Sequence, residues 1–226
     1  MLNIINYQTN IQKLITEEYT NMLCARCNIN PIQIQSKVNV PTELTCATEF
    51  DLIDKKDEII VNLNEGDVTY INKPENEIAV TDYERYVLSL PQSMQKGMKR
   101  SDFIVYDDKT TGFIILNEIA HRKNAFDKKT DAIHQLSETL TLLCNCPAIS
   151  KEFEKYSVRA CVFSNRYNKI SSPMEMADAF NYGIEISRTV SIVVGEDIPS
   201  IKSLGFNYYK SSKIDISTTG VKFFTY

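Results

Sequence analysis

The centre of the sequence constrains the fold most, because two apolar runs there are separated only by a short polar segment. Residues 101–106 read SDFIVY, residues 113–119 read FIILNEI, and residues 107–112 between them read DDKTTG. Runs rich in β-branched and aromatic side chains predict strands, and a short polar connection predicts that the two strands pair as an antiparallel hairpin. The almost continuous apolar character of the second run is typical of a strand buried on both faces.

Further elements follow from the spacing of apolar residues along the chain. Helical periodicity predicts helices over residues 9–27 and 130–144, and an apolar run predicts a strand over residues 157–164. Weaker patterns predict strands over residues 68–72, 77–81, 184–194 and 220–226, a helix over residues 173–182, and a loop around Tyr208 and Tyr209. This order of elements predicts an α/β fold with a central mixed β-sheet flanked by helices.

Length and composition narrow the class of protein. A chain of 226 residues fits a single domain spanning residues 1–226. No apolar run approaches the ~18 residues of a membrane span, and the N-terminal residues lack the order of a signal peptide. We therefore expect a cytoplasmic protein without a membrane partner, in which the six cysteines stay reduced.

The charges are unevenly distributed along the chain. Residues 41–85 contain twelve acidic and four basic side chains, whereas residues 96–129 contain eight basic and five acidic ones. The protein as a whole has a formal net charge of −4, so it is not a generally basic nucleic-acid-binding chain. A local reversal of sign marks the segment that would meet a polyanion, although a solvated surface of mixed charge explains it equally well.

Two carboxylates are predicted to meet at the open end of the central hairpin. Asp102 lies at the start of the first strand and Glu118 near the end of the second. Antiparallel pairing places the start of one strand beside the end of the next. Two close carboxylates repel each other unless a proton or a cation lies between them, and Mg²⁺ favours such hard oxygen ligands. The pair therefore predicts a Mg²⁺ site, unless the two acids are ordinary surface residues at strand ends.

Basic residues flank this pair on both sides. Lys99 and Arg100 precede Asp102, while His121, Arg122 and Lys123 follow Glu118. Acids that hold a metal ion between bases that hold a phosphate backbone are typical of enzymes that act on nucleic acids.

These segments together resemble the PD-(D/E)xK nuclease superfamily, which includes restriction endonucleases and repair nucleases. The resemblance rests on KRSDFIVY at residues 99–106, FIILNEI at 113–119, AIHQL at 132–136 and RACVFS at 159–164. It implies a restriction-endonuclease-like core over about residues 77–195, an N-terminal helix and acidic segment over 1–76, and a C-terminal extension over 196–226. It also implies a DNA endonuclease that depends on Mg²⁺ or Mn²⁺, with a role in restriction or anti-phage defence.

The resemblance assigns roles to particular residues. Asp102 matches the first acid and Glu118 the second, so both would bind the metal, and Gln135 matches a helix glutamine that orients water or a metal ligand. Ala120 stands where the superfamily has its lysine. Lys123 is the best-placed substitute, with Arg122, His121 and Lys128 as further candidates. The side chains expected to contact DNA are Lys99, Arg100, Arg122 and Lys128.

Other interpretations remain open at this stage. The missing lysine is compatible with a catalytically degenerate nuclease fold that acts as a nucleic-acid-binding or assembly subunit, as a homodimer or with a partner that docks on the acidic segment. An α/β protein unrelated to nucleases is a third possibility. Cys24 and Cys27 with Cys144 and Cys146 could supply four thiolates to zinc, but packed reduced cysteines are the commoner explanation.

Overall fold

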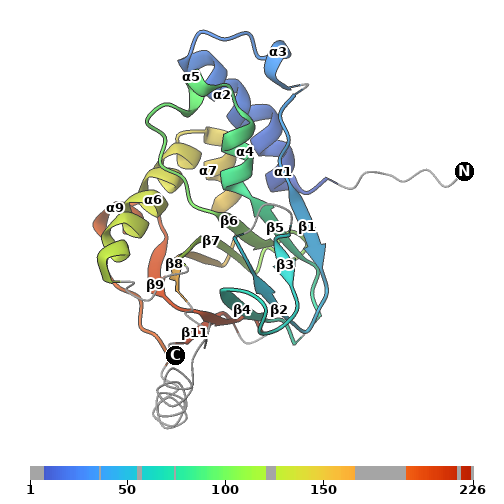
Figure 1. Cartoon of the computed structure of the whole chain (residues 1–226), viewed down its shortest axis with the longest axis vertical. Helices are drawn as coiled ribbons and strands as arrows, with labels where there is room; N and C mark the ends of the chain where they lie inside the picture. Colours follow the sequence, from blue (N-terminus) through green and yellow to red (C-terminus); the bar gives the residue numbers. More distant parts are fainter. Residues whose placement is uncertain are drawn as a thin grey trace, which may run out of the picture.

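The computed structural model describes residues 8–35, 37–54, 58–73, 75–120, 126–165, 192–217 and 220–224. Helices gather at one end of the molecule and strands at the other (Figure 1). The predicted helix over residues 173–182 and most of the predicted strand over 184–194 lie outside the described residues.

The N-terminal helix is continuous from residue 10 to residue 26 and changes its winding midway. It consists of α1 (Asn10–Leu14), a π-helical turn (Ile15–Tyr19) and α2 (Thr20–Arg26). Thr9 caps its start, because the threonine side chain accepts a hydrogen bond from the backbone N–H of Gln12. The other helices are α3 (Ile32–Gln35), α4 (Tyr83–Ser89), α5 (Gln92–Gln95), α6 (Phe126–Cys144), α7 (Pro147–Phe153) and α9 (Pro199–Lys202).

The larger sheet has six strands in the order β1-β5-β6-β7-β8-β9. The strands β1, β5, β6 and β7 pair antiparallel with one another, whereas β8 runs parallel to β7 and β9 parallel to β8. Their bounds are β1 (Thr42–Thr45), β5 (Ile78–Asp82), β6 (Phe103–Asp107), β7 (Phe113–Ile119), β8 (Val158–Ser164) and β9 (Asn207–Lys210).

The smaller sheet has five strands in the order β11-β10-β4-β2-β3, and it is also mixed because β10 runs parallel to β4. Its strands are β2 (Glu49–Leu52), β3 (Ile60–Val61), β4 (Val68–Ile71), β10 (Lys213–Asp215) and β11 (Lys222–Phe224). The protein is therefore a mixed α/β fold built on two mixed sheets with helices.

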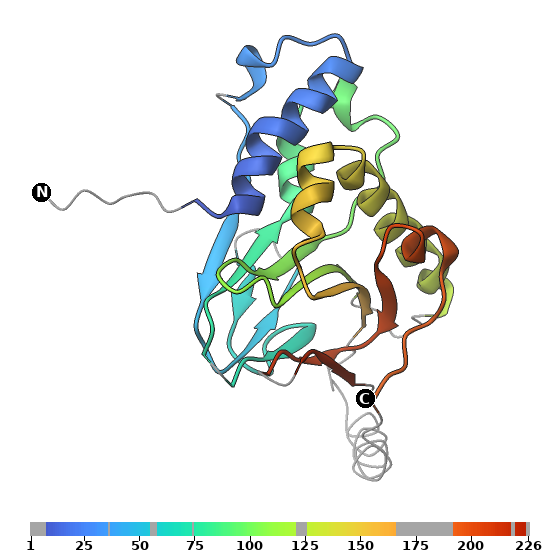
Figure 2. The same ribbon diagram turned by 180° about the vertical axis from the view of Figure 1, so that it is seen from behind.

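The six-stranded sheet lies between the helices and the five-stranded sheet, as the opposite view also shows (Figure 2). On its helical face, Ile104, Leu116 and Phe163 pack with α1, α2, α4, α6 and α7. On its other face, Val105 and Ile115 pack with residues of the five-stranded sheet. All seven residues of β7 are buried for this reason, which confirms the prediction of a strand covered on both faces.

The two sheets are also joined by a buried polar contact. The Tyr70 hydroxyl of β4 donates a hydrogen bond of 2.8 Å to Oδ1 of Asn117 in β7. The Asn117 amide nitrogen donates in turn to the carbonyl of Val162 in β8, at 3.1 Å. A buried amide must be hydrogen-bonded, and these partners fix Asn117 on the side of β7 that faces the smaller sheet.

The structure also corrects one sequence-based prediction. Tyr208 and Tyr209 lie in β9 and not in a loop, with Tyr208 fully buried beside Cys161 of β8. The polar residues that follow them resembled a loop boundary, but pairing with a buried neighbouring strand outweighs that local signal.

Candidate metal centre

The register of the central hairpin brings Asp102 beside Glu118. Phe103 pairs with Asn117, so Asp102 and Glu118 are the next positions along the two paired segments. The backbone N–H of Ile119 donates to Oδ2 of Asp102 at 2.6 Å. Both acids are more than nine-tenths buried. The two residues are therefore neighbours along the hairpin, while the joint metal binding of their carboxylates stays a prediction.

Strand alternation decides which way the Glu118 side chain points. Leu116 and Ala120, two positions before and after it, pack in the core on the helical face of the sheet. Glu118 therefore lies on that face, opposite to the Asn117 side chain. The Glu118 side chain is buried there, so its carboxylate is shielded from bulk water.

Two further acids join Asp102 from distant parts of the sequence. Carboxylate oxygens of Asp54, Glu84 and Asp102 all lie within 4.8 Å of one another. Asp54 follows β2 of the smaller sheet, and Glu84 lies in the first turn of α4. The group runs from the buried Asp102 through the half-buried Glu84 to the exposed Asp54, so it opens toward the solvent on one side.

The turn into α4 places Glu84 next to Asp102. The Asp82 side chain caps this helix by accepting a hydrogen bond of 2.7 Å from the backbone N–H of Arg85. The backbone N–H groups of Tyr83 and Glu84 donate to the carbonyl of Asp102. The start of α4 is thus fixed to the residue whose side chain it approaches.

The concentration of negative charge is costly in this position. Burial raises the pKa of Asp102 well above its ordinary value, the hydrogen bond from Ile119 opposes that shift, and the charges of Asp54, Glu84 and Asp82 raise the pKa further. Burial likewise raises the pKa of Asp82, against the opposing effects of Arg85. Such a cluster calls for a proton or a cation to compensate its charge.

The chemistry of the donor set fits a divalent cation of the Mg²⁺ type. Mg²⁺ and Mn²⁺ favour carboxylate and water oxygens over nitrogen or sulfur, and one or two carboxylates with several waters suffice for Mg²⁺. Asp54, Glu84 and Asp102 offer oxygens that are close enough to share one ion. Glu118 directly precedes Ile119, whose N–H anchors Asp102, but its carboxylate is not part of this group.

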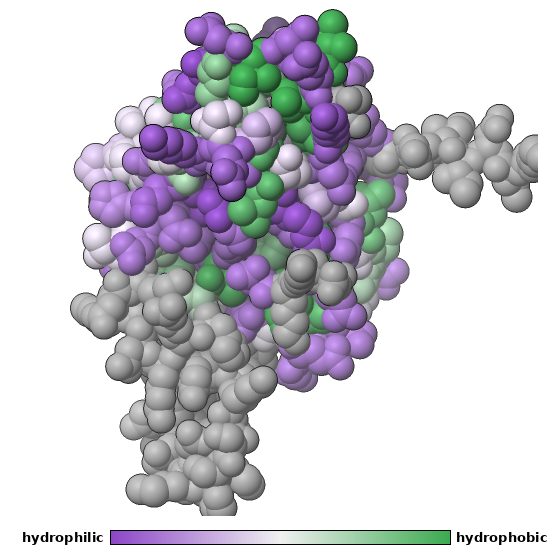
Figure 3. Space-filling model, turned by 45° about the horizontal axis from the view of Figure 1, so that its top comes forward, coloured by the Kyte–Doolittle hydropathy of each residue, from purple (hydrophilic) through white to green (hydrophobic). Residues whose placement is uncertain are grey.

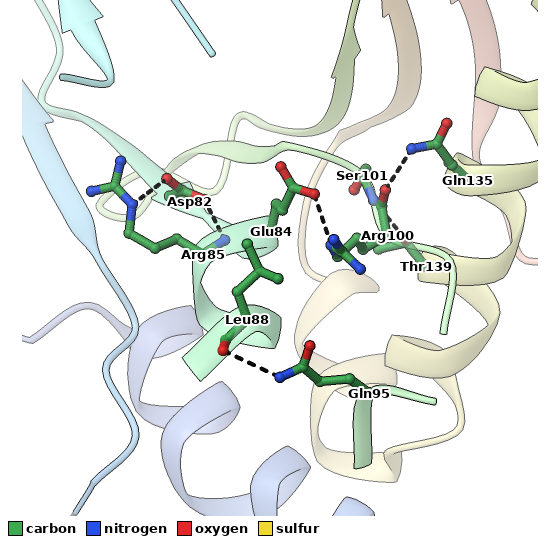
Figure 4. A network of polar contacts seen from close by, with 9 residues as sticks. All are labelled: Asp82, Glu84, Arg85, Leu88, Gln95, Arg100, Ser101, Gln135 and Thr139. Carbon is green, nitrogen blue, oxygen red and sulfur yellow. Dashed lines mark hydrogen bonds and ion pairs between the residues drawn. The ribbon is translucent and has the colours of Figure 1, made fainter. Parts of the chain in front are cut away.

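Helix α6 supports the backbone that leads into Asp102. The Gln135 side-chain amide donates to the carbonyl of Arg100 at 3.1 Å, and the backbone N–H of Ser101 donates to Oγ1 of Thr139 at 2.8 Å (Figure 4). The predicted role of Gln135 on water or metal stays a prediction, but its observed contact positions the strand that carries Asp102.

The structure describes only some of the basic residues that were expected to contact DNA or to replace the missing lysine. Lys99 is exposed, and Arg100 forms an ion pair with Glu84 in which Nε lies 2.8 Å from Oε1. Arg122 and Lys123 lie outside the described residues, as does the side chain of Lys128. The assignment of these three residues stays a prediction. Figure 3 shows one face of the molecule, which is largely hydrophilic, with apolar groups mostly toward its helical end.

Ala120 directly follows β7 and is almost fully buried. Its backbone N–H donates to the carbonyl of Ser164 at 2.8 Å, so the parallel pairing of β7 with β8 continues to this residue. A methyl group thus stands on the helical face of the sheet where the resemblance implies a lysine.

Sequence reasoning missed Asp54 and Glu84 as partners of Asp102. Both belong to the acid-rich segment of residues 41–85, which was interpreted as a docking surface for a partner. The excess of acids was a usable signal, but it did not distinguish two of the twelve. Their selection depends on how the smaller sheet and α4 pack against the central hairpin.

The thiolate alternative gains no support in the described part of the chain. The six cysteines are free thiols there, and the group of possible metal ligands found among the described residues is the acidic one. Cys24 and Cys146 are buried in the helical core, in keeping with packed reduced cysteines.

Comparisons with protein-family models, with curated proteins and with solved structures give no significant match for this chain. Among the described residues, no helix combines the length and the apolar character needed to cross a membrane. The function must therefore be argued from the site itself.

Proposed function

We propose that this protein is a Mg²⁺-dependent DNA endonuclease of the PD-(D/E)xK type. The observation that carries the proposal is the meeting of Asp102 with Asp54 and Glu84, at the end of the hairpin where the register places Glu118 beside Asp102. Carboxylates gathered from two sheets and a helix around one buried acid are costly to fold, and a bound divalent cation would compensate that cost.

The arrangement of elements supports the same proposal. The N-terminal helix packs on the antiparallel strands β5, β6 and β7, α6 follows, and β8 then runs parallel to β7. The superfamily that the chain resembles has a core of a helix, a three-stranded meander, a helix and a further strand. This order is similar, except that α4 and α5 are inserted between β5 and β6; Asp102 lies directly before β6 and Glu118 in β7. The smaller sheet is an addition that supplies Asp54.

Each residue then has a task. Asp102, Glu84 and Asp54 would hold the ion, which would supply an activated water and stabilise charge on the phosphodiester. Glu118 is the further metal-binding acid that the resemblance implies, next to this group on the hairpin. Thr139 and Gln135 keep the backbone before Asp102 in place, and Lys99 offers an exposed cation to the DNA backbone.

Cleavage of plasmid and single-stranded DNA with Mg²⁺ or Mn²⁺ tests the proposal. We expect Asp102→Ala and Glu118→Ala each to lower the rate by at least about 100-fold, because loss of even an indirect metal contact costs 10- to 100-fold. Asp108→Asn, at the opposite end of the same hairpin, is the matched control and retains activity. Cleavage that survives both site substitutions would refute the assignment.

A second function is favoured by one observation, the buried methyl group of Ala120 at the lysine position. In that case the protein binds a cation and DNA but does not cleave, and it serves as a binding or assembly subunit. DNA binding that depends on Asp102, without cleavage under any divalent ion, would decide for this alternative.

A further inference from the structure

Glu84 is shared between the acidic cluster and a basic side chain. Its Oε1 lies 2.8 Å from Nε of Arg100, while its carboxylate also lies within 4.8 Å of those of Asp54 and Asp102. The Glu84 and Arg100 side chains remain 32% and 27% exposed, so burial does not lock the pair. An ion pair at this exposure is worth little free energy and can be exchanged for another partner.

Hydrogen bonds from α6 fix the backbone at Arg100, whereas the Arg100 guanidinium forms the partly exposed ion pair with Glu84. Gln135 donates to the carbonyl of Arg100, and Thr139 accepts from the N–H of Ser101 (Figure 4). Any rearrangement at this point is therefore confined to the Arg100 side chain. Arg100 directly follows the exposed Lys99, on the segment that leads to Asp102.

We propose that a divalent cation and Arg100 compete for the Glu84 carboxylate, and that the guanidinium released by the cation binds a phosphate of DNA. This inference rests on the proposed function. In the cation-free protein, Arg100 neutralises part of the clustered negative charge. When the cation takes over that task, the guanidinium becomes available for the planar, bidentate contact with phosphate that arginine forms well.

A consequence is that the cation and DNA strengthen each other's binding. Coupling of two binding sites is reciprocal, so a cation that tightens DNA binding must itself be bound more tightly when DNA is present. The protein would then engage DNA preferentially when its metal centre is loaded.

The first test is calorimetric titration with Mn²⁺ alone. Competition predicts that Arg100→Ala raises Mn²⁺ affinity by roughly threefold, the order of an exposed ion pair. If Arg100 only positions Glu84, the same substitution lowers the affinity, and an unchanged or lowered affinity overturns the inference.

Arg85→Ala is the matched control for general electrostatics. Arg85 lies next to Glu84 in sequence, but its Nε pairs with Asp82 at 3.1 Å. Removing it deletes the same charge near the same cluster without freeing Glu84. An equal gain in Mn²⁺ affinity from Arg85→Ala would mean that charge alone explains the effect, and would overturn the inference.

A double-substitution cycle isolates the shared carboxylate. Glu84→Gln lowers Mn²⁺ affinity, and adding Arg100→Ala in that background is expected to change it no further. A persistent effect of Arg100→Ala without the Glu84 carboxylate contradicts the competition. Circular dichroism and thermal melting of each variant ensure that only folded proteins are compared.

The DNA half of the inference is tested by the fluorescence anisotropy of a short DNA duplex with and without Ca²⁺, used to limit cleavage. We expect Ca²⁺ to tighten binding to the wild type and Arg100→Ala to lose most of that gain. An undiminished gain overturns the phosphate contact. Failure of Asp102→Asn to weaken Mn²⁺ binding would instead refute the proposed function, so the two failures are distinguishable.

Discussion

A buried aspartate lies at each end of the β6 region, Asp102 directly before the strand and Asp107 at its last position, and the two have different surroundings. At the turn, Oδ1 of Asp107 accepts hydrogen bonds from the backbone N–H groups of Lys109 and Thr110, at 3.0 and 2.9 Å, and Oδ2 accepts from the Thr110 hydroxyl. At the open end, Asp102 accepts one from Ile119 and faces other acids. Equal burial therefore does not imply an equal role. A carboxylate with local donors stabilises a turn, whereas one among other carboxylates needs a proton or a cation to compensate its charge.

The largest contrast is expected from substituting each of the two aspartates by asparagine. Asp102→Asn removes a buried charge from a repulsive group, so it abolishes most Mn²⁺ binding and lowers cleavage by at least about 100-fold while the fold stays intact. Asp107→Asn leaves Mn²⁺ binding unchanged but lowers the free energy of unfolding by about 1–3 kcal/mol, because backbone donors lose a charged acceptor. Titration calorimetry and denaturant unfolding measure the two effects. If both variants lose the same property, the two ends do not differ in role.

A second prediction concerns the basic side chain that takes the place of the missing lysine, at the end of the hairpin that carries Asp102. If Lys123 takes this role, Lys123→Ala lowers the cleavage rate by about 100-fold or more, as expected for a group that activates or positions the attacking water. Ala120→Lys in the Lys123→Ala background should then restore part of the rate. Single-turnover cleavage assays follow both variants, and an undiminished rate in Lys123→Ala excludes it as the substitute.

The smallest expected effect is a dependence of stability on pH. The pKa of Asp102 is raised in the folded protein by burial and by neighbouring acids, so between its unfolded value of about 3.9 and the raised folded value the folded state holds the extra proton. Without a divalent cation, stability relative to Asp102→Asn therefore falls as the pH rises through this window, by up to about 1.4 kcal/mol per pH unit. Denaturant unfolding between pH 4 and 8 measures it, and added Mg²⁺ should reduce the loss. A constant difference between the two proteins would show that Asp102 keeps its ordinary pKa.

Sequence patterns were most reliable where structure depends on neighbours along the chain. The strand predicted over residues 113–119 has those bounds in the structure, and the predicted helix over 130–144 is contained in α6. Sequence patterns failed where pairing with a distant segment determines the structure. Tyr208 was predicted to lie in a loop, but it lies in β9, which pairs with β8. The strands predicted over residues 68–72 and 77–81 are close in sequence, and nothing in their patterns indicated that β4 and β5 belong to different sheets.

The amino-acid sequence by itself determined that Asp102 and Glu118 would be neighbours, because a short polar turn between two apolar strands fixes their antiparallel register. Only the tertiary structure decided that Asp54 and Glu84 complete the group. Asp54 reaches it because the smaller sheet packs on the face of β6 and β7 opposite to the helices, and Glu84 because α4 begins on the carbonyl of Asp102. Contacts between segments so far apart depend on packing in three dimensions, and no local pattern of residues encodes them.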